Sequence, residues 1–393
     1  MGRDAYDIVM LVLNNVAYDT RVRREAAALA AGGWRVLVIG TQRHDGALPD
    51  CERIDGFDLR RVRYGAYGAG LGRPWRWLRH GLQAAQIIRA LRNVRARAHH
   101  AHDFPALLVV WAARIGQRPR ARLIYDAHEL YLFMSPYESL WINRWHALTR
   151  PLFMRIEGAL ARRADAVLTL SEPEARLLAR WYPIARPVVI ANAVDPLDEA
   201  QRGQGAALNG STLVHIGEIT DRGRTLSEMI RALALLPESV SLAFLGWGAD
   251  QPRLERLAQA SGVAERVLFV PPVAPDRVPE AVQSARAALV LQRPDSFNTR
   301  AGAPIKLYEA IAAGLPVVAS ETEDLRRLVR HWDVGMVCDS RDPAAIAAAI
   351  REMLDPAQQA RYRANVRRAQ QAVTWQREAA KLRAVYRGLL GDA

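Results

Sequence analysis

The chain has 393 residues, half of them hydrophobic, and a formal net charge of +13 at pH 7. This length exceeds what one hydrophobic core usually supports, so we expect two domains, and the hydrophobic content excludes an intrinsically disordered chain. The charge is uneven, since residues 1–195 carry +11 and residues 196–393 carry +2, which predicts that only one half meets an anionic partner such as a membrane surface or a nucleic acid.

The first half of the chain alternates predicted strands and helices. Strands are expected at Tyr6–Leu13, Trp34–Gly40, Arg122–Tyr125, Ala166–Leu170 and Val188–Ile190, and helices at Arg21–Ala31, Trp75–Arg95, Pro105–Ile115, Glu138–Arg162 and Glu172–Trp181. Such alternation is typical of an α/β fold with a doubly wound parallel sheet.

The second half repeats this layout. Its predicted strands are Thr212–Ile216, Ser241–Leu245, Val267–Val270, Ala287–Leu291, Pro316–Ala319 and Gly335–Val337. We therefore expect two Rossmann-like parallel-sheet domains facing across a cleft, residues 1–195 and 196–371, with a helix in residues 372–393 that crosses back to the first domain.

The sequence also carries signals about the compartment. Cys51 and Cys338 are few and far apart, which predicts no disulfide framework. The first 13 residues lack the features of a secretory signal, and no apolar run approaches the roughly 18 residues of a membrane span. We expect a cytoplasmic protein.

Glycines and basic side chains follow several predicted strands of the second half. The segment Gly217–Arg224 (GEITDRGR) follows the first of these strands, and Gly246–Gly248 (GWG) follows the second. Ligands of parallel sheets bind beyond the carboxyl ends of the strands, so these residues predict a cradle for a diphosphate.

Lys306 and Glu309 are three residues apart behind Pro304, at the start of a short predicted helix, and therefore share one helix face. A cation at a helix N-terminus strengthens an anion site, and the glutamate would accept hydrogen bonds from a ribose diol. The alternative is a solvated surface pair.

The segments GEITDRGRTLSEMIRAL and APIKLYEAIAAGLPVVAS resemble the donor domain of glycosyltransferase family 4, the group 1 retaining enzymes with the GT-B fold. The segments YDTRVRREAAALAAGGWRVLVIG, AHHAHDFPAL and IYDAHELY are similar to blocks of that family's first domain. The resemblance implies a nucleotide-diphosphate sugar donor in the second domain and an acceptor in the first. We expect no metal or other cofactor, because basic side chains and a helix N-terminus can stabilise the leaving diphosphate.

Carried over by position, Arg222 and Lys306 correspond to the basic pair on the donor diphosphate, and Glu309 to the ribose-binding glutamate. The donor-binding residues are thus expected to be Gly217, Arg222, Arg224, Gly246, Val273, Asn298, Lys306, Leu307 and Glu309. Position 301, where the family often has a glutamate, is alanine here, so contacts to the sugar must come from elsewhere, such as Asn298 or the amides around Gly302.

Candidates for the first domain lie at strand ends. We expect Asp103 and His128 to act in catalysis beside Arg222 and Lys306, and Asp19, Arg21, His102 and Glu129 to bind the acceptor. The alternative role of His102 and Asp103 is a helix cap before Pro105, since Asp is a preferred N-cap. His99 and His100 are expected to be structural, and no Asp-x-Asp motif or zinc-ligand spacing is present.

Two basic, tryptophan-bearing segments, 73–97 and 141–155, predict helices that lie on anionic lipid, with ordinary amphipathic helices on a sheet as the alternative. The expected function is transfer of a sugar to a lipid-linked saccharide or glycolipid acceptor in cell-surface polysaccharide biosynthesis, by a cytoplasmic enzyme held at the inner face of the plasma membrane. The alternatives are a nucleotide-sugar 2-epimerase, a phosphorylase, or a basic nucleic-acid-binding protein; we expect no nucleic-acid partner.

Overall fold

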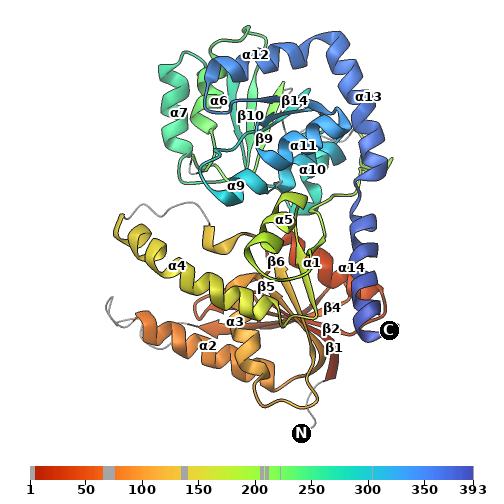
Figure 1. The fold of residues 1–393 in the computed structure, drawn as a ribbon. Helices are drawn as coiled ribbons and strands as arrows, with labels where there is room; N and C mark the ends of the chain where they lie inside the picture. The colour runs from red at the N-terminus through yellow and green to blue at the C-terminus, as the bar shows by residue number, and fades with distance from the viewer. Residues whose placement is uncertain are drawn as a thin grey trace. The chain divides into compact units, whose positions relative to one another are not determined.

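The structure is a computed structural model, and its chain divides into two compact units (Figure 1). It describes residues 5–64, 76–133, 140–203, 208, 212–221, 223–302 and 304–392, with the backbone alone described for 76–80, 131 and 140–147. Unit 1 comprises Met1–Leu132, Tyr137–Ile190 and Ala379–Ala393, and unit 2 comprises Phe133–Pro136 and Ala191–Glu378. The long segment of unit 2 thus begins after Ile190, where we predicted the boundary after Asp195.

Unit 1 is built on a sheet of eight strands in the order β3-β4-β2-β1-β5-β6-β7-β8 among the described residues. The strands are β1 (Ala5–Leu11), β2 (Val36–Arg43), β3 (Cys51–Ile54), β4 (Phe57–Tyr64), β5 (Arg95–His102), β6 (Arg122–Ala127), β7 (Ala166–Thr169) and β8 (Val188–Val189). The helices are α1 (Thr20–Ala31), α2 (Arg76–Arg92), α3 (Asp103–Arg114), η2 (Tyr131–Phe133), α4 (Leu140–Ala161) and α5 (Glu172–Trp181). All neighbouring strands are parallel except the β3–β4 pair, as the predicted α/β fold requires.

Strand β5 lies between β1 and β6 near the middle of the sheet, although we predicted no strand there. Its sequence, RARAHHAH, lacks the apolar residues by which a buried strand is recognised. Its histidines are nevertheless buried, and burial lowers the pKa of His99 to about 4 and lowers the pKa of His100. Neutral imidazole rings thus replace the expected aliphatic side chains. Strands β3 and β4 were also not predicted.

Unit 2 has a parallel sheet of six strands in the order β11-β10-β9-β12-β13-β14 within the described residues, and each of the six predicted strands is present. The strands are β9 (Leu213–Ile216), β10 (Leu242–Leu245), β11 (Val267–Val270), β12 (Ala287–Val290), β13 (Val317–Ser320) and β14 (Gly335–Cys338). The helices are α6 (Leu226–Leu233), α7 (Gln251–Ala260), η3 (Ala264–Arg266), η4 (Pro275–Arg277), α8 (Val278–Val282), α9 (Phe297–Ala301), α10 (Ile305–Ala312), α11 (Glu323–Trp332), α12 (Pro343–Leu354) and α13 (Pro356–Ala372).

Both faces of this second sheet are buried, because its strands alternate between two apolar clusters. Leu242 and Phe244 of β10 belong to one cluster, whereas Ala243 and Leu245 belong to the other. Helices cover both faces (Figure 1). This arrangement leaves the strand ends and the loops that follow them as the places where polar residues gather.

The last helix, α14 (Trp375–Leu390), begins in unit 2, and its residues from Ala379 onward belong to unit 1. The buried Tyr386 hydroxyl lies 2.8 Å from Nδ1 of His100 on β5. Within the described part of the chain, no helix combines the length and apolarity needed to span a membrane.

Candidate functional site

Three glycines shape the loops that follow β9 and β10 in unit 2. Gly217 and Gly246 have backbone φ angles of +113° and +155°, which residues other than glycine rarely adopt. A Cβ atom on Gly246 would lie 2.0 Å from the Gly217 carbonyl oxygen, and one on Gly248 would lie 2.0 Å from the Ile219 carbonyl oxygen. The two loops therefore pack backbone against backbone.

The side chain of Lys306 lies directly over the first of these loops. A Cβ atom on Gly217 would be 2.7 Å from Cε and 3.1 Å from Nζ of Lys306. Burial and the nearby guanidinium of Arg224 lower the pKa of Lys306 to about 7, against the opposing effect of Glu309 and Glu218. Two basic groups held close together in this way are poised for an anion that would relieve their repulsion.

His215 lies beneath this basic pair and was not predicted from the sequence. It is fully buried on β9, two residues before Gly217, and its Nδ1 is 3.4 Å from the Leu289 carbonyl oxygen. Burial lowers its pKa well below the usual value, and the positive charges of Lys306 and Arg224 lower it further. A neutral ring therefore supports the loop without adding charge, and the only signal was a polar residue inside a predicted buried strand.

Glu309 is on α10, one turn after Lys306, and is 6% exposed. Its carboxylate acts to raise the pKa of Lys306, so the two charges interact as their spacing predicted. Because Glu309 is buried, the alternative of a solvated surface pair is wrong.

Leu307 does not fit its predicted role in donor binding. Its side chain is fully buried in the apolar core, and its amide donates to the Pro304 carbonyl oxygen at 3.1 Å. Neither group is left for a ligand, so this prediction is wrong.

The other residues predicted to bind the donor lie in different parts of unit 2. Arg224 donates from Nη1 to Oε2 of Glu218 at 3.2 Å, and Val273 is half-buried in the connection between β11 and η4. Asn298 is half-buried on α9. Arg222 lies outside the described residues, so its predicted contact with the diphosphate stays a prediction.

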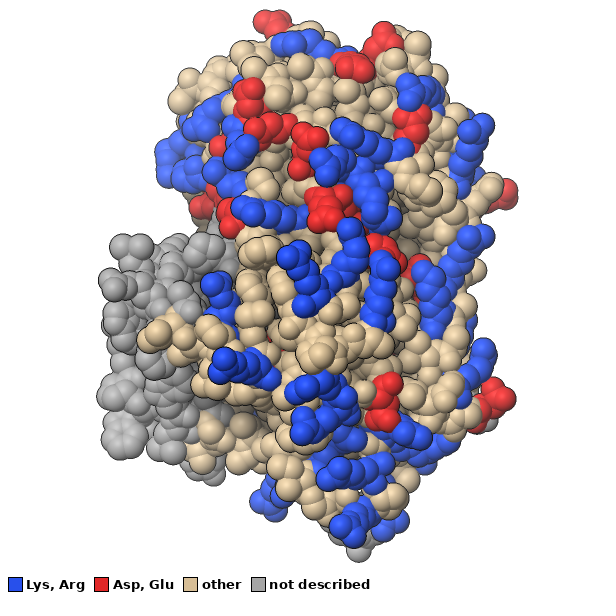
Figure 2. All heavy atoms as spheres, in the orientation of Figure 1, with Lys and Arg blue, Asp and Glu red and all other residues tan. Residues whose placement is uncertain are grey.

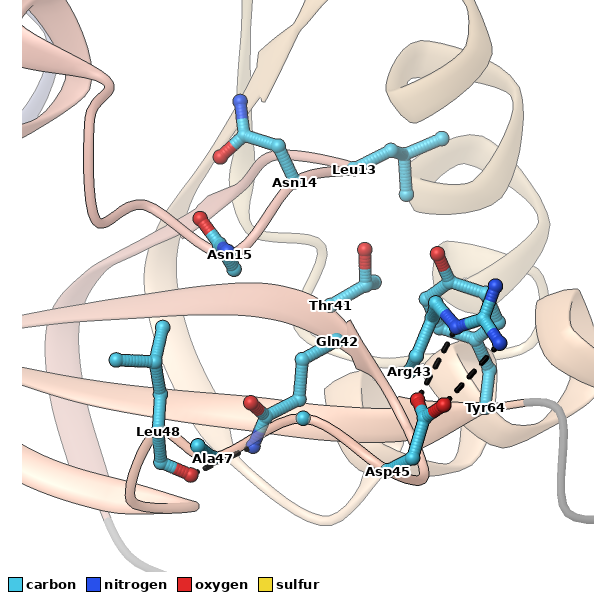
Figure 3. A pocket seen from close by; sticks show the side chains of 11 residues that line it. Leu13, Asn14, Asn15, Thr41, Gln42, Arg43, Asp45, Ala47, Leu48 and Tyr64 are labelled. Carbon is cyan, nitrogen blue, oxygen red and sulfur yellow. Dashed lines mark hydrogen bonds and ion pairs between the residues drawn. The ribbon is translucent and has the colours of Figure 1, made fainter.

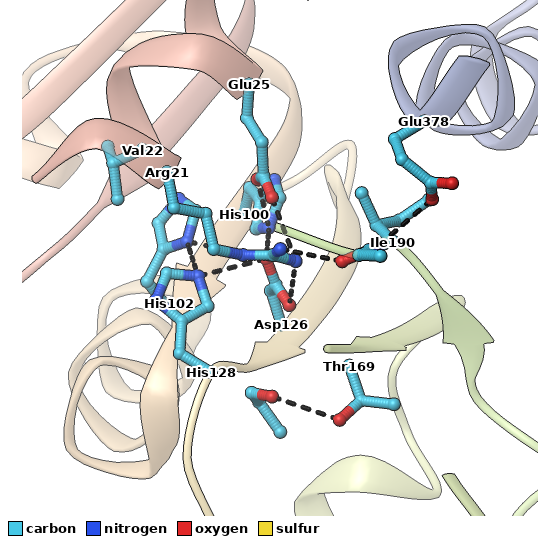
Figure 4. A network of polar contacts seen from close by, with 12 residues as sticks. Arg21, Val22, Glu25, His100, His102, Asp126, His128, Thr169, Ile190 and Glu378 are labelled. Atoms are coloured by element: carbon cyan, nitrogen blue, oxygen red, sulfur yellow. Dashed lines mark hydrogen bonds and ion pairs between the residues drawn. The ribbon is translucent and has the colours of Figure 1, made fainter. Parts of the chain in front are cut away.

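A buried network of charged side chains occupies the carboxyl end of β5 and β6 in unit 1 (Figure 4). Arg21 of α1 donates to both carboxylate oxygens of Asp126, from Nη2 to Oδ1 at 3.1 Å and from Nε to Oδ2 at 3.3 Å. Its Nη2 also lies 3.0 Å from Oε1 of Glu25, and its Nη1 donates to the Ile190 carbonyl oxygen at 2.7 Å. Every nitrogen of this guanidinium therefore has a partner inside unit 1.

We predicted that Arg21 and His102 contact the acceptor. In the structure both are held inside this network and are only 6% and 2% exposed. Burial lowers the pKa of His102 well below its usual value. Nδ1 of this neutral ring lies 2.8 Å from Nε2 of His128 and is assigned as the acceptor of that hydrogen bond. Both residues position neighbouring groups and do not reach an acceptor.

His128 lies at the edge of the network, with its side chain 12% exposed. Burial acts to lower its pKa, but the carboxylates of Asp126 and Asp103 outweigh burial and raise it to about 9. Its Nε2 lies 3.0 Å from Oδ2 of Asp126. His128 is thus an imidazolium at neutral pH, which donates hydrogen bonds and has no lone pair to accept a proton.

The predicted alternative of a helix cap holds by position for His102, without a side-chain capping bond, and is wrong for Asp103. The N-cap is His102, and Asp103 is the first helical residue, with an unusual φ of +67°. Oδ1 of Asp103 accepts from the amides of His128 and Glu129 at 2.9 and 3.2 Å. Asp103 therefore fixes the loop that presents His128, and strained backbone of this kind is common at functional sites. Glu129 is half-buried, and burial raises its pKa.

Asp19 is the N-cap of α1. Its Oδ1 accepts from the Val22 amide at 3.0 Å, and its Oδ2 accepts from Nδ2 of Asn14 at 2.8 Å. Asp19 thus fixes the β1–α1 loop against the first turn of α1, and its predicted contact with the acceptor stays a prediction.

Four possible metal ligands come together in unit 1, with their ligand atoms within 4.8 Å of one another: Glu25, His100, His102 and Asp126. The guanidinium of Arg21 is already bonded to Asp126 and lies against Glu25. Because this side chain already neutralises the carboxylate of Asp126, the residues fit an internal ion pair better than a metal centre.

Comparison with known families divides the chain in the same way as its fold. The family model "Glycosyl transferases group 1" matches residues 198–370, and "Glycosyl transferase 4-like domain" matches residues 17–193. Together the two models cover most of the chain.

Individual relatives agree with these families. A D-inositol 3-phosphate glycosyltransferase of Geodermatophilus obscurus is 32% identical over 307 residues, covering 73% of this chain and 65% of that protein. A phosphatidyl-myo-inositol mannosyltransferase of Mycobacterium leprae is 30% identical over 266 residues, covering 65% of this chain and 63% of that protein. The chain thus spans just under two thirds of the length of these relatives.

Solved structures share the fold at low sequence identity. The Anabaena protein HepE, crystallised with UDP-glucose, superposes with a TM-score of 0.70 at 18% identity, covering 98% of this chain and all of that one. This similarity supports the architecture of two parallel-sheet α/β units.

Proposed function

Because this chain belongs to the group 1 glycosyltransferases, with the GT-B fold, we propose that it transfers a sugar from a nucleoside diphosphate sugar to a hydroxyl group of an acceptor. The observation that carries this proposal is the position of Lys306 over the Gly217 loop, beside Arg224. This arrangement suits the diphosphate that departs when the bond between the donor sugar and the phosphate breaks.

The donor half of the reaction needs a stabilised leaving group. The ammonium of Lys306 and the guanidinium of Arg224 would neutralise the charge that develops on the diphosphate, so this step requires no metal. Glu309, buried one turn further along α10, would accept hydrogen bonds from the ribose hydroxyls. The presence of UDP-glucose in the similar structure of HepE supports a donor of this class.

The acceptor half needs a proton to leave the attacking hydroxyl. The pKa of His128, raised to about 9, makes this residue a hydrogen-bond donor and not a base. We therefore assign the proton to an oxygen of the leaving phosphate on the same face of the sugar, which gives retention of the anomeric configuration. His128 would orient substrate hydroxyls from a position fixed by Asp103 and Asp126.

We further propose a lipid-linked or glycolipid acceptor used in building cell-surface polysaccharide. One support is the relative named phosphatidyl-myo-inositol mannosyltransferase. Another is charge: on the face shown in Figure 2, unit 1 presents many basic and few acidic side chains, whereas unit 2 presents both. The tryptophan side chains of the two predicted lipid-binding segments, at positions 75, 77, 141 and 145, lie outside the described residues.

A thermal-shift screen across nucleoside diphosphates and their sugars tests the proposed function. A cognate donor at a hundred times its dissociation constant should stabilise the protein by about 2.7 kcal/mol. Product analysis with and without acceptor separates transfer from epimerisation, because an epimerase needs no acceptor. Salt-sensitive DNA binding without any shift from nucleotide sugars would instead support a nucleic-acid-binding protein.

A further inference from the structure

Glu218 places a carboxylate beside the basic groups proposed to bind the diphosphate, and no role described so far uses it. It directly follows Gly217, and its Oε2 accepts a hydrogen bond from Nη1 of Arg224 at 3.2 Å. Its charge also acts to raise the pKa of Lys306, so it attracts both basic groups. Because like charges repel, this carboxylate opposes the anion that the two basic groups would bind.

The main chain on both sides of Glu218 is fixed. The Gly217 amide donates to the Leu245 carbonyl oxygen and the Ile219 amide to the Trp247 carbonyl oxygen, each at 2.8 Å. The side chain of Glu218, in contrast, is 50% exposed. Rotation about its side-chain bonds alone can therefore move the carboxylate away from its partner while the loop keeps its shape.

Arg224 is held in place without the help of Glu218. Its amide donates to the Asp221 carbonyl oxygen at 3.1 Å, and its carbonyl oxygen accepts from Nε of Arg293 at 2.9 Å. The Arg293 amide also donates to the Gly223 carbonyl oxygen at 3.0 Å. Since an exposed ion pair contributes little to stability, the contact between Glu218 and Arg224 is not needed to build the loop.

The charges around the Gly217 loop show what Glu218 does there. Arg224 acts to lower the pKa of Lys306, whereas the carboxylates of Glu309 and Glu218 act to raise it. Glu309 is buried, and the proposed function assigns it to the ribose. Glu218 is exposed and can be displaced. When no diphosphate is bound, Glu218 thus supplies part of the negative charge that the diphosphate would otherwise bring.

We propose that Glu218 competes with the diphosphate for Arg224 and Lys306, and so weakens the binding of the nucleoside diphosphate that remains after transfer. The inference rests on the proposed function, because it concerns the same site. The free terminal phosphate of a nucleoside diphosphate has a second pKa of roughly 6, so at neutral pH it carries one more negative charge than its sugar ester. Glu218 therefore repels the product more than the donor, which makes it a residue that determines specificity between the two.

Calorimetry on the full chain at about pH 7.5 tests this competition. The probes are inorganic pyrophosphate and the diphosphates UDP, GDP and ADP, each beside its glucose ester. Glu218→Gln should tighten the binding of an accepted diphosphate by about fivefold, because it removes a like charge near a multivalent anion. The gain should be smaller for the glucose ester, and it should largely disappear at about 1 M salt, where the Debye length is about 3 Å.

The comparison of diphosphate with ester also separates two effects of the substitution. Loss of Glu218 lowers the charge on Lys306, since Glu218 acts to raise the pKa of that lysine. This change affects both ligands alike, so the ratio of their dissociation constants reports the repulsion by Glu218 itself.

Asp45→Asn is the matched control. Figure 3 shows the Asp45 carboxylate bonded to the guanidinium of Arg43, with Nε and Oδ1 3.1 Å apart, and the Asp45 side chain is 56% exposed. This pair belongs to unit 1. The control changes the net charge by the same amount and leaves the Gly217 loop intact, so it should leave the affinity for the diphosphate unchanged.

Unchanged or weaker binding of the diphosphate by Glu218→Gln would overturn the proposal, as would an equal gain in the control or a larger gain for the ester. If diphosphates bind and the substitution changes nothing, the competition is wrong while the proposed transferase function stands. If diphosphates show the gain but no sugar ester binds, the proposed transfer fails while the competition for the diphosphate stands. If no probe binds to either protein, both fail.

Discussion

At the scale of single residues, Lys306 and Glu309 share a helix face but are expected to act at different stages of the reaction. Lys306→Ala should reduce turnover by about two to three orders of magnitude, because it removes a contact that strengthens as the diphosphate departs. Glu309→Ala should mainly raise KM, since a ribose contact is the same in the ground and transition states. Steady-state kinetics of both variants decide the matter, and equal, small effects would contradict the diphosphate assignment.

The pKa of Lys306 leads to a second prediction at this scale. An anionic diphosphate near Nζ should raise this pKa above its free value of about 7. Binding at about pH 8 should therefore take up close to one proton, and the uptake should vanish near pH 6, where the free lysine is already charged. The contribution of Lys306 to affinity is thus complete below about pH 7 and is lost as the pH rises through the pKa of the complex.

Calorimetry of nucleoside diphosphate binding in buffers of different ionisation enthalpy measures this uptake. Lys306→Arg is the control, because arginine stays charged throughout this range. If the arginine variant takes up as many protons as the unmodified protein, the protons are not taken up by Lys306.

At the scale of elements, the network around Arg21 joins α1 to β5 and β6. Asp126→Asn should destabilise unit 1 by about 3–5 kcal/mol, because it removes the carboxylate that pairs with a buried guanidinium. Chemical denaturation measures this change, and a loss below about 1 kcal/mol would show that Arg21 does not depend on Asp126.

Glu25→Gln is the matched comparison in the same network. Burial, together with Asp126, raises the pKa of Glu25 to about 8, despite the opposing effect of Arg21. The folded protein then holds a proton that the unfolded chain releases, so the contribution of this residue to stability falls as the pH rises from its usual pKa toward 8. The glutamine variant should therefore match the unmodified protein near pH 5 and exceed its stability near pH 8.

Two side chains fix the peptide between Ile190 and Ala191, which follows β8. The Ile190 carbonyl oxygen accepts from Arg21, and the adjoining Ala191 amide donates to Oε2 of Glu378 at 3.0 Å. The Ile190–Ala191 peptide is thus held on one side by Arg21 and on the other by Glu378.

At the scale of the whole molecule, the charge asymmetry predicts association with anionic membranes. Basic side chains near an anionic surface contribute about 1 kcal/mol each, and interfacial aromatic residues add an apolar component that salt does not remove. The protein should bind anionic vesicles more tightly than neutral ones and should be released only partly by high salt.

Sedimentation with vesicles tests this prediction. Replacing Trp75 and Trp77 by Ala, together with Arg76 and Arg79 by Glu, should abolish binding without changing the affinity for the donor. If the protein does not bind anionic vesicles at low salt but transfers sugar to a soluble acceptor at the full rate, the membrane proposal is wrong and the transferase function is retained.

The metal-free scheme predicts that activity persists in excess chelator, and a strict metal requirement would contradict it.

The sequence by itself determined most of the strands, the two-unit division and the basic character of the donor loops. Apolar strands such as β10, glycine-marked turns and the three-residue spacing of Lys306 and Glu309 are local signals. Each depends on neighbours within a few positions along the chain, so it can be predicted from the amino-acid sequence.

Only the tertiary structure decided how the polar residues of unit 1 are used. Strand β5 was missed because its histidines resemble a surface segment until Arg21, Asp126 and Tyr386, all distant in sequence, surround them. Arg21 and His102 were predicted to contact substrate, since exposure cannot be read from residue type. Burial and pairing depend on contacts between remote parts of the chain, and those contacts also set the pKa values that make His128 a cation and Lys306 a group that titrates near neutral pH.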